Sequence, residues 1–587
     1  MKLDPPLLPR PSSSRDLPTL RPILPAPPRW NTPEFYFYYV VFSALLPMML
    51  KCAWDFSSET HPNYKQYVHR LSSGWLFGRK LDNSDAQYRG FRNNVHILIP
   101  VSLLHTLLSH LLSPLTPPQN IAKVRTTFSL AFSILFLSVI HGASVLKILI
   151  IAGMNYAIVK GCKGHWIGPA LVWIWNLGIM FTSAAWGGFP YRGLSESLAW
   201  LDAYNGLGFR WWNTFNFTSL RMISFAMDYY WQCSKPPKQV NAVQSHINTC
   251  NICSATHNIR CERARVIIDL PSQDYNLLNF FSYLLYVPLY LAGPIITFND
   301  FIWQNHHPPK SITPRSTLIY GLRWIGVYLL MECMLHGFHI VAIKDAHAWG
   351  GFTPFQMSMV GYFNLKVIWL KLLIIWRFFR LWVGFDLMLV LAGFLCLTKV
   401  FSSMQAMADR IETTENMTRC MSDNYSAIDF WKNWHRSFNR WLVRYVYIPL
   451  GGSKYYIFNI FPTFTFVAIW HDIELKLLTW GWLVAIFILP EFLLRREFGK
   501  EKWKTRLGQN LRHVTAMAAV VNIFLMMTAN LVGFAVGIDG IREMAGQIFR
   551  PSGVLFLIVT CVALFSGVQV MFEWREMEKR REWKVEK

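Results

Sequence analysis

Long apolar runs separated by short polar segments dominate the chain from residue 35 to residue 572. A transmembrane helix needs about 20 predominantly apolar residues. Apolar runs near this length predict spans around 35–52, 94–113, 126–140, 145–160, 166–184, 276–303, 317–343, 357–376, 381–401, 457–471, 475–494, 514–537 and 553–572. Because Gly and His interrupt several runs, we expect about eleven true spans and some short helices within the membrane.

One aromatic stretch departs from this pattern. Residues 209–231 combine many aromatic side chains with Arg210, Arg221 and Asp228. Charged groups facing lipid are costly, so the stretch predicts a re-entrant or interfacial helix rather than a lipid-facing span.

Polar segments divide the chain into parts. Residues 1–34 are Pro-rich and predict a disordered N-terminal tail, and residues 573–587 predict a charged C-terminal tail. Between them, 35–572 forms one transmembrane domain, with a hydrophilic insertion at 233–274 and a polar, amphipathic segment at 404–452. We therefore predict an all-α, polytopic membrane bundle that encloses an internal chamber.

Composition excludes a soluble globule. Hydrophobic residues make up 53% of the chain and charged residues 16%, against about 25% charged in soluble domains. The net charge is +23. Because the basic residues lie in loops between apolar runs, anionic membrane lipids or a phosphorylated co-substrate are the expected partners. No nucleic-acid motif is present, and we expect no nucleic-acid partner.

A histidine at the end of an apolar run is the first candidate for chemistry. His471 closes the run that begins near Phe458. A neutral imidazole at that depth can accept a proton from a hydroxyl group. The alternative is a purely structural histidine at the end of a span.

A repeating pattern of cations marks the second candidate. Lys432, Arg436, Arg440 and Arg444 recur every four residues, which on a helix makes one basic stripe. His435 and Asn439 share another face of the same helix. The pattern predicts one face that holds phosphates and one that presents polar groups to a reaction site. The alternative is an interfacial helix with its cations among lipid headgroups.

The hydrophilic insertion contains a cluster of soft metal ligands. Cys250, Cys253, His257 and Cys261 follow one another closely, and such residues suit tetrahedral zinc. The competing interpretation is a flexible loop with free or disulfide-bonded cysteines. We expect no resident cofactor, with zinc at this cluster as the secondary interpretation.

Several separated blocks resemble the membrane-bound O-acyltransferase superfamily. They are Gly74–Arg79, Arg210–Asn213, Pro288–Pro294, Phe298–Phe301, Phe430–Gly452 and the pair Trp470-His471, which stands 36 residues after His435. The opening Arg29–Tyr39 is similar to the fungal glycerol-uptake-protein and hedgehog-acyltransferase-like branch of that superfamily.

This resemblance implies a multi-pass enzyme of the endoplasmic reticulum that remodels GPI anchors. Such an enzyme transfers a long or very long acyl chain from acyl-CoA to the lyso-lipid of GPI-anchored proteins, or to a lysophospholipid. By position, His471 matches the catalytic histidine of the superfamily and His435 its second polar site, with Asn439 beside it. Lys432, Arg436, Arg440 and Arg444 would then bind acyl-CoA.

Other functions remain open at this point. The resemblance implies Asp at the second polar site in hedgehog acyltransferases, which acylate a protein amine. His435 departs from that pattern. A protein amine or a glycerol-like alcohol is nevertheless the alternative acceptor. A polyol transporter that uses the histidines as proton relays is the alternative of another class.

Overall fold

The computed structural model describes residues 27–112, 116–207, 210–234, 245–254, 261–268, 270–309, 312–384 and 411–586. Within these residues the regular secondary structure is helical apart from one short antiparallel ladder, in which β1 (Leu71–Ser72) pairs with β2 (Leu81–Asp82). The predicted all-α class is confirmed.

Ten helices in the described ranges are long and apolar enough to cross a membrane. They are α1 (Pro33–Phe56), α3 (Ala86–Leu112), α4 (Ile121–His141), α5 (Ser144–Gly161), α6 (Ile167–Ala185), α15 (Pro314–Gly337), α17 (Pro354–Gly384), α23 (Leu475–Phe498), α25 (Asn510–Phe534) and α27 (Pro551–Glu586). The predicted span at 381–401 lies outside the described residues from 385 onward, and 381–384 form the last turn of α17.

The other helices, most of them shorter, connect these elements or fill the space between them. The first group is α2 (Tyr64–Tyr67), η1 (Val68–Arg70), η2 (Pro118–Asn120), α7 (Tyr191–Leu194), η3 (Glu196–Ala203), α8 (Trp211–Ser234), α10 (Asn251–Ser254), α11 (Glu262–Ile267), η4 (Ser272–Asp274), α12 (Leu277–Leu285), α13 (Val287–Tyr290), α14 (Phe298–His306) and α16 (Ile340–Asp345). The second group is α20 (Ala427–Asn433), α21 (Arg436–Leu442), η6 (Val443–Tyr447), η7 (Gly452–Tyr455), α22 (Tyr456–His471), α24 (Glu501–Leu507) and α26 (Gly537–Ile548).

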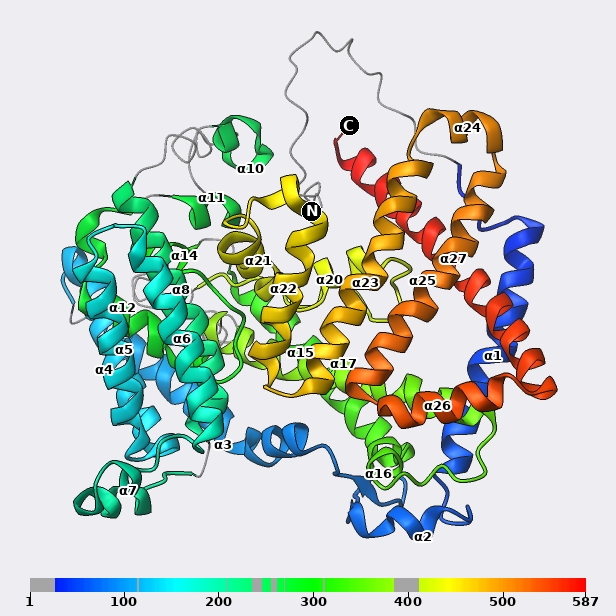
Figure 1. The fold of residues 1–587 in the computed structure, drawn as a ribbon, viewed down its shortest axis with the longest axis horizontal. Helices are drawn as coiled ribbons and strands as arrows, with labels where there is room; N and C mark the ends of the chain where they lie inside the picture. Colours follow the sequence, from blue (N-terminus) through cyan, green and yellow to red (C-terminus); the bar gives the residue numbers. More distant parts are fainter. Residues whose placement is uncertain are drawn as a thin grey trace.

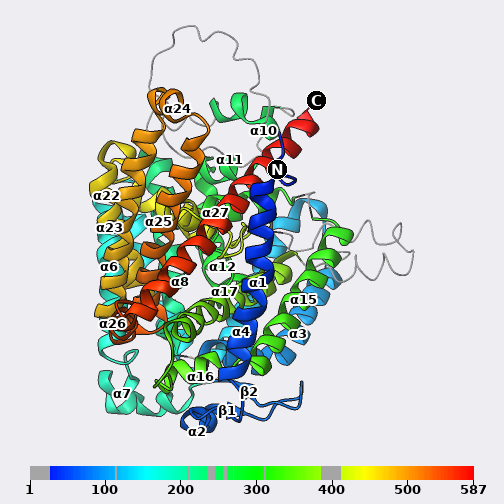
Figure 2. The same ribbon diagram turned by 90° about the vertical axis from the view of Figure 1, so that its right-hand side faces the viewer.

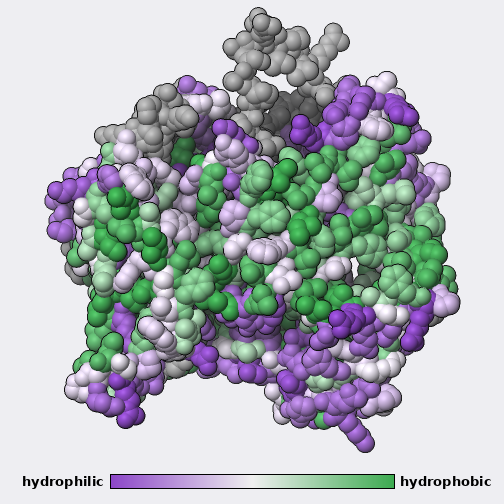
Figure 3. All heavy atoms as spheres, viewed as in Figure 1, coloured by the Kyte–Doolittle hydropathy of each residue, from purple (hydrophilic) through white to green (hydrophobic). Residues whose placement is uncertain are grey.

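The long helices stand side by side and surround a set of shorter central helices (Figures 1 and 2). In Figure 3, apolar residues form a band across the middle of the molecule, and hydrophilic residues gather above and below it. Large apolar side chains of the long helices are exposed, including Ile174 of α6 and Leu555 and Ile558 of α27. A contiguous apolar surface of this extent requires lipid as its solvent.

The helix α8 lies in the core of the bundle, so the predicted interfacial location is wrong. It packs against α5, α6, α12 and α14 and is buried along most of its length. Its charged residues are accepted there because they have partners: Arg221 Nη1 donates to the carbonyls of Tyr283 (3.3 Å) and Leu284 (2.7 Å). The prediction that this stretch does not face lipid is confirmed.

The predicted span at 276–303 is also wrong, because the chain breaks it into α12, α13 and α14. Pro288 and Pro294 lack the backbone N–H that a continuous helix needs at those positions. Thr297 then starts α14 anew, because its side chain accepts from the backbone N–H of Asp300 (3.3 Å).

The charged C-terminal segment continues α27 as far as Glu586, so the tail predicted for 573–587 is not a separate part. Glu573 is almost fully buried and accepts from the backbone N–H of Arg29 (3.2 Å) and from Arg512 Nη1 (3.5 Å). These contacts tie the C-terminal helix to the residues just before α1. Of the predicted N-terminal tail, residues 1–26 lie outside the described residues.

Candidate active site

A sharp break in the polar segment sets the geometry of the site. The helix α20 ends at Asn433, α21 begins at Arg436, and His435 between them has a left-handed backbone with φ of 46°. The continuous helix predicted to carry the cationic stripe is therefore wrong. A left-handed backbone costs a residue other than glycine about 1–2 kcal/mol, so the surrounding structure must hold His435 in place.

Asn416 supplies this support. Its carbonyl accepts from the backbone N–H of Arg436 (3.0 Å), and its side-chain Oδ1 accepts from that of Ser437 (3.1 Å). The hydroxyl of Ser437 in turn accepts from the backbone N–H of Ile295 (2.9 Å). The sequence shows Asn416 only as part of an Asn-x-Thr triplet, and nothing in its local pattern indicates this contact.

The imidazole of His435 is buried among aromatic rings. It stacks on Trp376 of α17, with ring centroids 4.4 Å apart and planes inclined by 22°. Phe438 and Trp470 close its other sides at 5.1 and 5.9 Å. Its Nε2 has no hydrogen-bond partner within the described residues. A buried polar atom left in this state requires an explanation, and a substrate oxygen is a natural partner.

His471 is the last residue of α22 and, unlike its neighbour Trp470, is exposed. Trp470 and Asn216 of α8 exchange two hydrogen bonds. Trp470 Nε1 donates to the Asn216 carbonyl (2.8 Å), and Asn216 Nδ2 donates to the Trp470 carbonyl (2.6 Å). This pair fixes the end of α22, and the rings of Trp480 and Phe534 flank the His471 imidazole at 5.9 and 6.3 Å.

The two predicted histidines both lie next to the indole ring of Trp470. The ring centroid of Trp470 lies 5.9 Å from that of His435 and 5.0 Å from that of His471. Asn439 lies one turn after His435 on α21, and its backbone N–H donates to the His435 carbonyl (3.0 Å).

The four predicted phosphate-binding cations have different surroundings. Lys432 is exposed, with Asp429 at 3.6 Å, and Arg436 is half-buried. Arg440 forms an ion pair with Glu262 of α11. Arg444 binds Asp228 of α8 at 3.0 Å and lies over the ring of Trp231. Three of the four cations therefore have a carboxylate partner: Asp429 for Lys432, Glu262 for Arg440 and Asp228 for Arg444.

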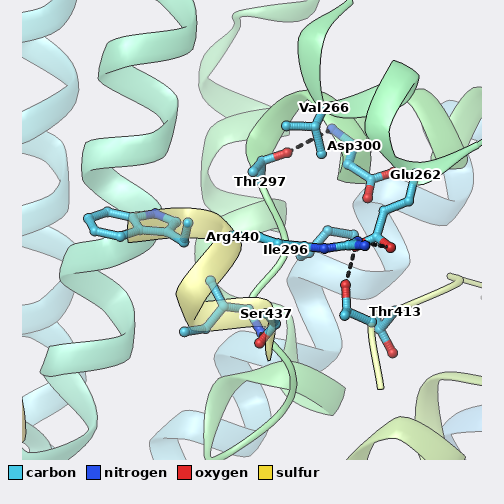
Figure 4. A pocket seen from close by; sticks show the side chains of 11 residues that line it. Glu262, Val266, Ile296, Thr297, Asp300, Thr413, Ser437 and Arg440 are labelled. Carbon is cyan, nitrogen blue, oxygen red and sulfur yellow. Dashed lines mark hydrogen bonds and ion pairs between the residues drawn. The ribbon is translucent and has the colours of Figure 1, made fainter. Parts of the chain in front are cut away.

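A small cavity of about 30 Å³ lies beside α21 on the side of α11 and α14. Its lining residues are Glu262, Val266, Ile295, Ile296, Thr297, Asp300, Thr413, Thr414, Ser437, Arg440 and Trp441. Figure 4 shows Arg440 extending from α21 toward Glu262. Although burial opposes ionisation, the Arg440 guanidinium lowers the pKa of Glu262. Neither His435 nor His471 lines this cavity, which adjoins the histidine site through α21.

The cysteines of the hydrophilic insertion converge, with a different histidine from the predicted one. Cys250, Cys253 and Cys261 lie together with His246, and their ligand atoms are all within 4.8 Å of one another. His257, the predicted fourth ligand, lies outside the described residues. This group is therefore the candidate metal centre of the described chain, separate from the two imidazoles.

Comparison with known proteins identifies the family. The family model described as "MBOAT, membrane-bound O-acyltransferase family" matches residues 197–538. This match covers more than half of the chain, from the helices before α8 to α26, and includes both histidines. The chain belongs to the membrane-bound O-acyltransferase family. It is therefore a multi-pass membrane acyltransferase, which uses an acyl donor and a lipid or protein acceptor.

Fungal relatives are similar over nearly the whole chain. The chain is 41% identical to "Membrane-bound O-acyltransferase GUP1" of Candida tropicalis, covering 94% of this chain and 89% of the relative. It is also 41% identical to "Membrane-bound O-acyltransferase GUP1" of Saccharomyces cerevisiae (strain ATCC 204508 / S288c), covering 97% and 95%. A more distant relative, "Protein-cysteine N-palmitoyltransferase HHAT" of Mus musculus, is 26% identical over 46% of this chain and 51% of its own.

Proposed function

We propose that this acyltransferase transfers a long or very long acyl chain from acyl-CoA to a hydroxyl group of the lyso-lipid of GPI-anchored proteins, in the endoplasmic reticulum membrane. The observation that carries the proposal is the exposed imidazole of His471, held at the end of α22 by the buried Trp470. The exposed residues that follow it alternate in character: Asp472 and Glu474 are charged, and Ile473 and Leu475 are apolar and 40% and 79% exposed. An edge with both polar and apolar groups suits a lyso-lipid, which has a polar headgroup beside its acyl chain, better than a small soluble alcohol. The resemblance to the fungal branch supports the GPI lipid as its source.

In the proposed reaction His471 is the general base. It takes the proton of the acceptor O–H as that oxygen attacks the thioester carbonyl carbon. The tetrahedral intermediate then collapses, the carbon–sulfur bond breaks, and His471 returns the proton to the thiolate of CoA. His435, whose Nε2 has no partner among the residues that the structure describes, donates a hydrogen bond to the oxyanion. Asn439, one turn further along α21, orients the thioester.

The donor's phosphates are assigned to the cations nearest the break between α20 and α21. Lys432 and Arg436 would contact them, because charged donors make the strongest hydrogen bonds to phosphate. Arg440 and Arg444, which bind Glu262 of α11 and Asp228 of α8, lie further along the chain from this break and would shape the wall of the donor site. The donor thus enters beside α20 and α21, and the acceptor enters beside the turn between α22 and α23.

A product analysis tests this assignment. Purified protein is incubated with labelled acyl-CoAs of graded chain length and four acceptors: a lyso-GPI lipid, a lysophospholipid, glycerol and a peptide with an N-terminal cysteine. We expect an ester on the lyso-GPI lipid, formed about tenfold or more faster than any other product. Mass spectrometry identifies the products, and the H471A variant serves as the background control. An amide on the peptide, or glycerol ester alone, would contradict the proposal.

A protein amine is the second candidate acceptor. The distant relative from Mus musculus is named as a protein-cysteine N-palmitoyltransferase, and the same assay includes its class of acceptor. The polyol transporter considered from the sequence is not retained, because the chain belongs to a family of acyltransferases.

Asn416 is expected to act as a positioning residue for His435. The N416A variant leaves the buried N–H of Ser437 without its acceptor, which costs about 1–3 kcal/mol, and frees the left-handed backbone at His435. We expect kcat to fall about tenfold or more with little change in KM for acyl-CoA.

The matched control is N424A. Asn424 is also buried, in the same segment, and its Nδ2 donates to the nearby backbone carbonyls of Cys420 (2.8 Å) and Met421 (3.5 Å). This variant should lose stability while keeping kcat within about twofold of the wild type. Equal losses of kcat in the two variants would assign Asn416 a general structural role.

A further inference from the structure

The cysteine-rich insertion beside the cavity has the geometry of a metal site. Three thiols and one imidazole, from His246, Cys250, Cys253 and Cys261, bring their ligand atoms within 4.8 Å of one another. In a tetrahedral site with zinc–sulfur bonds of about 2.3 Å, the sulfur atoms lie about 3.8 Å apart. The four atoms therefore already occupy a volume close to that of a coordination sphere.

The local backbone explains how the four ligands converge. Residues 245–249 and α10 are helical, and the backbone N–H of Cys250 donates to the His246 carbonyl (2.9 Å). His246, Cys250 and Cys253 stand at positions i, i+4 and i+7, which share one face of a helix. Cys261 approaches from the start of α11, and its Sγ lies 2.9 Å from His246 Nε2.

We propose that these four residues form a structural zinc site. Three soft thiolates and one imidazole favour zinc over calcium or magnesium, which prefer oxygen ligands. Four protein ligands also close the coordination sphere, as in structural rather than catalytic zinc sites. The Sγ of Cys261 already accepts from the backbone N–H of Ala264 (3.4 Å), an outer contact of the kind that orients a metal ligand.

The site lies next to the wall of the cavity. Cys261 precedes Glu262, which pairs with Arg440, and Arg265 on the same helix binds Asp300 at 2.6 Å. Both side chains of the second pair are 4% exposed. Zinc at Cys261 would fix the first turn of α11, and through it the two ion pairs that join α11 to α21 and α14. Its role is to hold the insertion against the catalytic segment.

Metal analysis of the purified full-length chain tests the proposal. The protein is prepared without a metal-affinity step, and its metals are measured by inductively coupled plasma mass spectrometry. We expect about one zinc per chain in the wild type. The double variant C250S/C253S should retain less than about a tenth of it, while C233S, which changes an exposed cysteine outside the cluster, should retain all of it. A wild type with no zinc, or a double variant with a full complement, overturns the site.

A pair of histidine variants tests the choice of ligand. H246A should lose most of the zinc, and H257A, at the position predicted from the sequence, should keep it. The reverse result overturns the ligand set. As a measurement that does not depend on a variant folding, a thiol-modifying reagent is added to wild-type protein in the presence of a chromogenic zinc chelator. We expect release of about one zinc per chain after modification and little before it, and no release overturns the proposal.

Discussion

Replacing His471 with alanine is expected to reduce acyl transfer by about 10²–10⁴-fold, the usual contribution of a general base. The imidazole lies at the end of α22 and is exposed, so its removal leaves the packing of Trp470 against Asn216 in place. KM for acyl-CoA should therefore change little, and the loss should appear in kcat. The measurement is steady-state transfer of a labelled acyl group by purified protein in detergent.

The matched control for this variant is H96A. His96 is an exposed histidine on α3, away from α22. Its replacement should leave the rate within about twofold of the wild type. If H471A kept a rate close to that of H96A, the role of general base would have to be abandoned and the proposed reaction with it.

The second large effect is expected at the buried pair of Asp228 and Arg444. The Asp228 side chain is fully buried and accepts from Arg444 Nη2 and from the hydroxyl of Tyr445, each at 3.0 Å. The D228N variant leaves the Arg444 charge buried without its counter-ion, which costs about 3–5 kcal/mol. We expect a clear fall in the apparent Tm measured in detergent.

Two further variants show whether the buried charge is the cause. In the double variant D228L/R444M no charge remains, so part of the lost stability should return. The exposed pair Arg192–Glu196 is the matched control, and E196Q should change stability by less than about 1 kcal/mol. Equal shifts in Tm for D228N and E196Q would contradict this account of the buried pair.

The membrane bundle could be predicted from the sequence, because a long apolar run indicates that the helix it forms is surrounded by lipid rather than water. Most predicted spans correspond to long helices, since a run of about 20 apolar residues has few other stable environments. Apart from the span at 276–303, which Pro288 and Pro294 interrupt, the wrong predictions come from contacts between distant segments. The polar residues of α8 have partners on α12, α14 and η6, and Glu573 of the supposed tail binds residues near α1.

The site could be predicted in part for a similar reason. The residue types of His435 and His471 stand out in apolar surroundings, and the resemblance to the family indicates both. The break at His435 was not predictable from the local sequence, because the pattern over α20 and α21 is that of one helix. The break depends on Asn416, whose carbonyl and side chain accept from the first backbone N–H groups of α21. The place of His246 beside Cys261 was not predictable either, because it depends on the fold of the insertion; His257, the ligand predicted from the sequence, lies outside the described residues.

By itself, the sequence determined that this chain is a multi-span helical membrane protein, and it supplied the two histidines and the cysteine cluster. These properties depend on the chemistry of short segments and on the energy of placing them in lipid or water. Only the tertiary structure decided which carboxylates pair with the cations, that His246 lies beside the cysteines and how the backbone turns at His435. Those features depend on side chains far apart in the sequence, whose pairing becomes favourable only when the whole bundle excludes water around them.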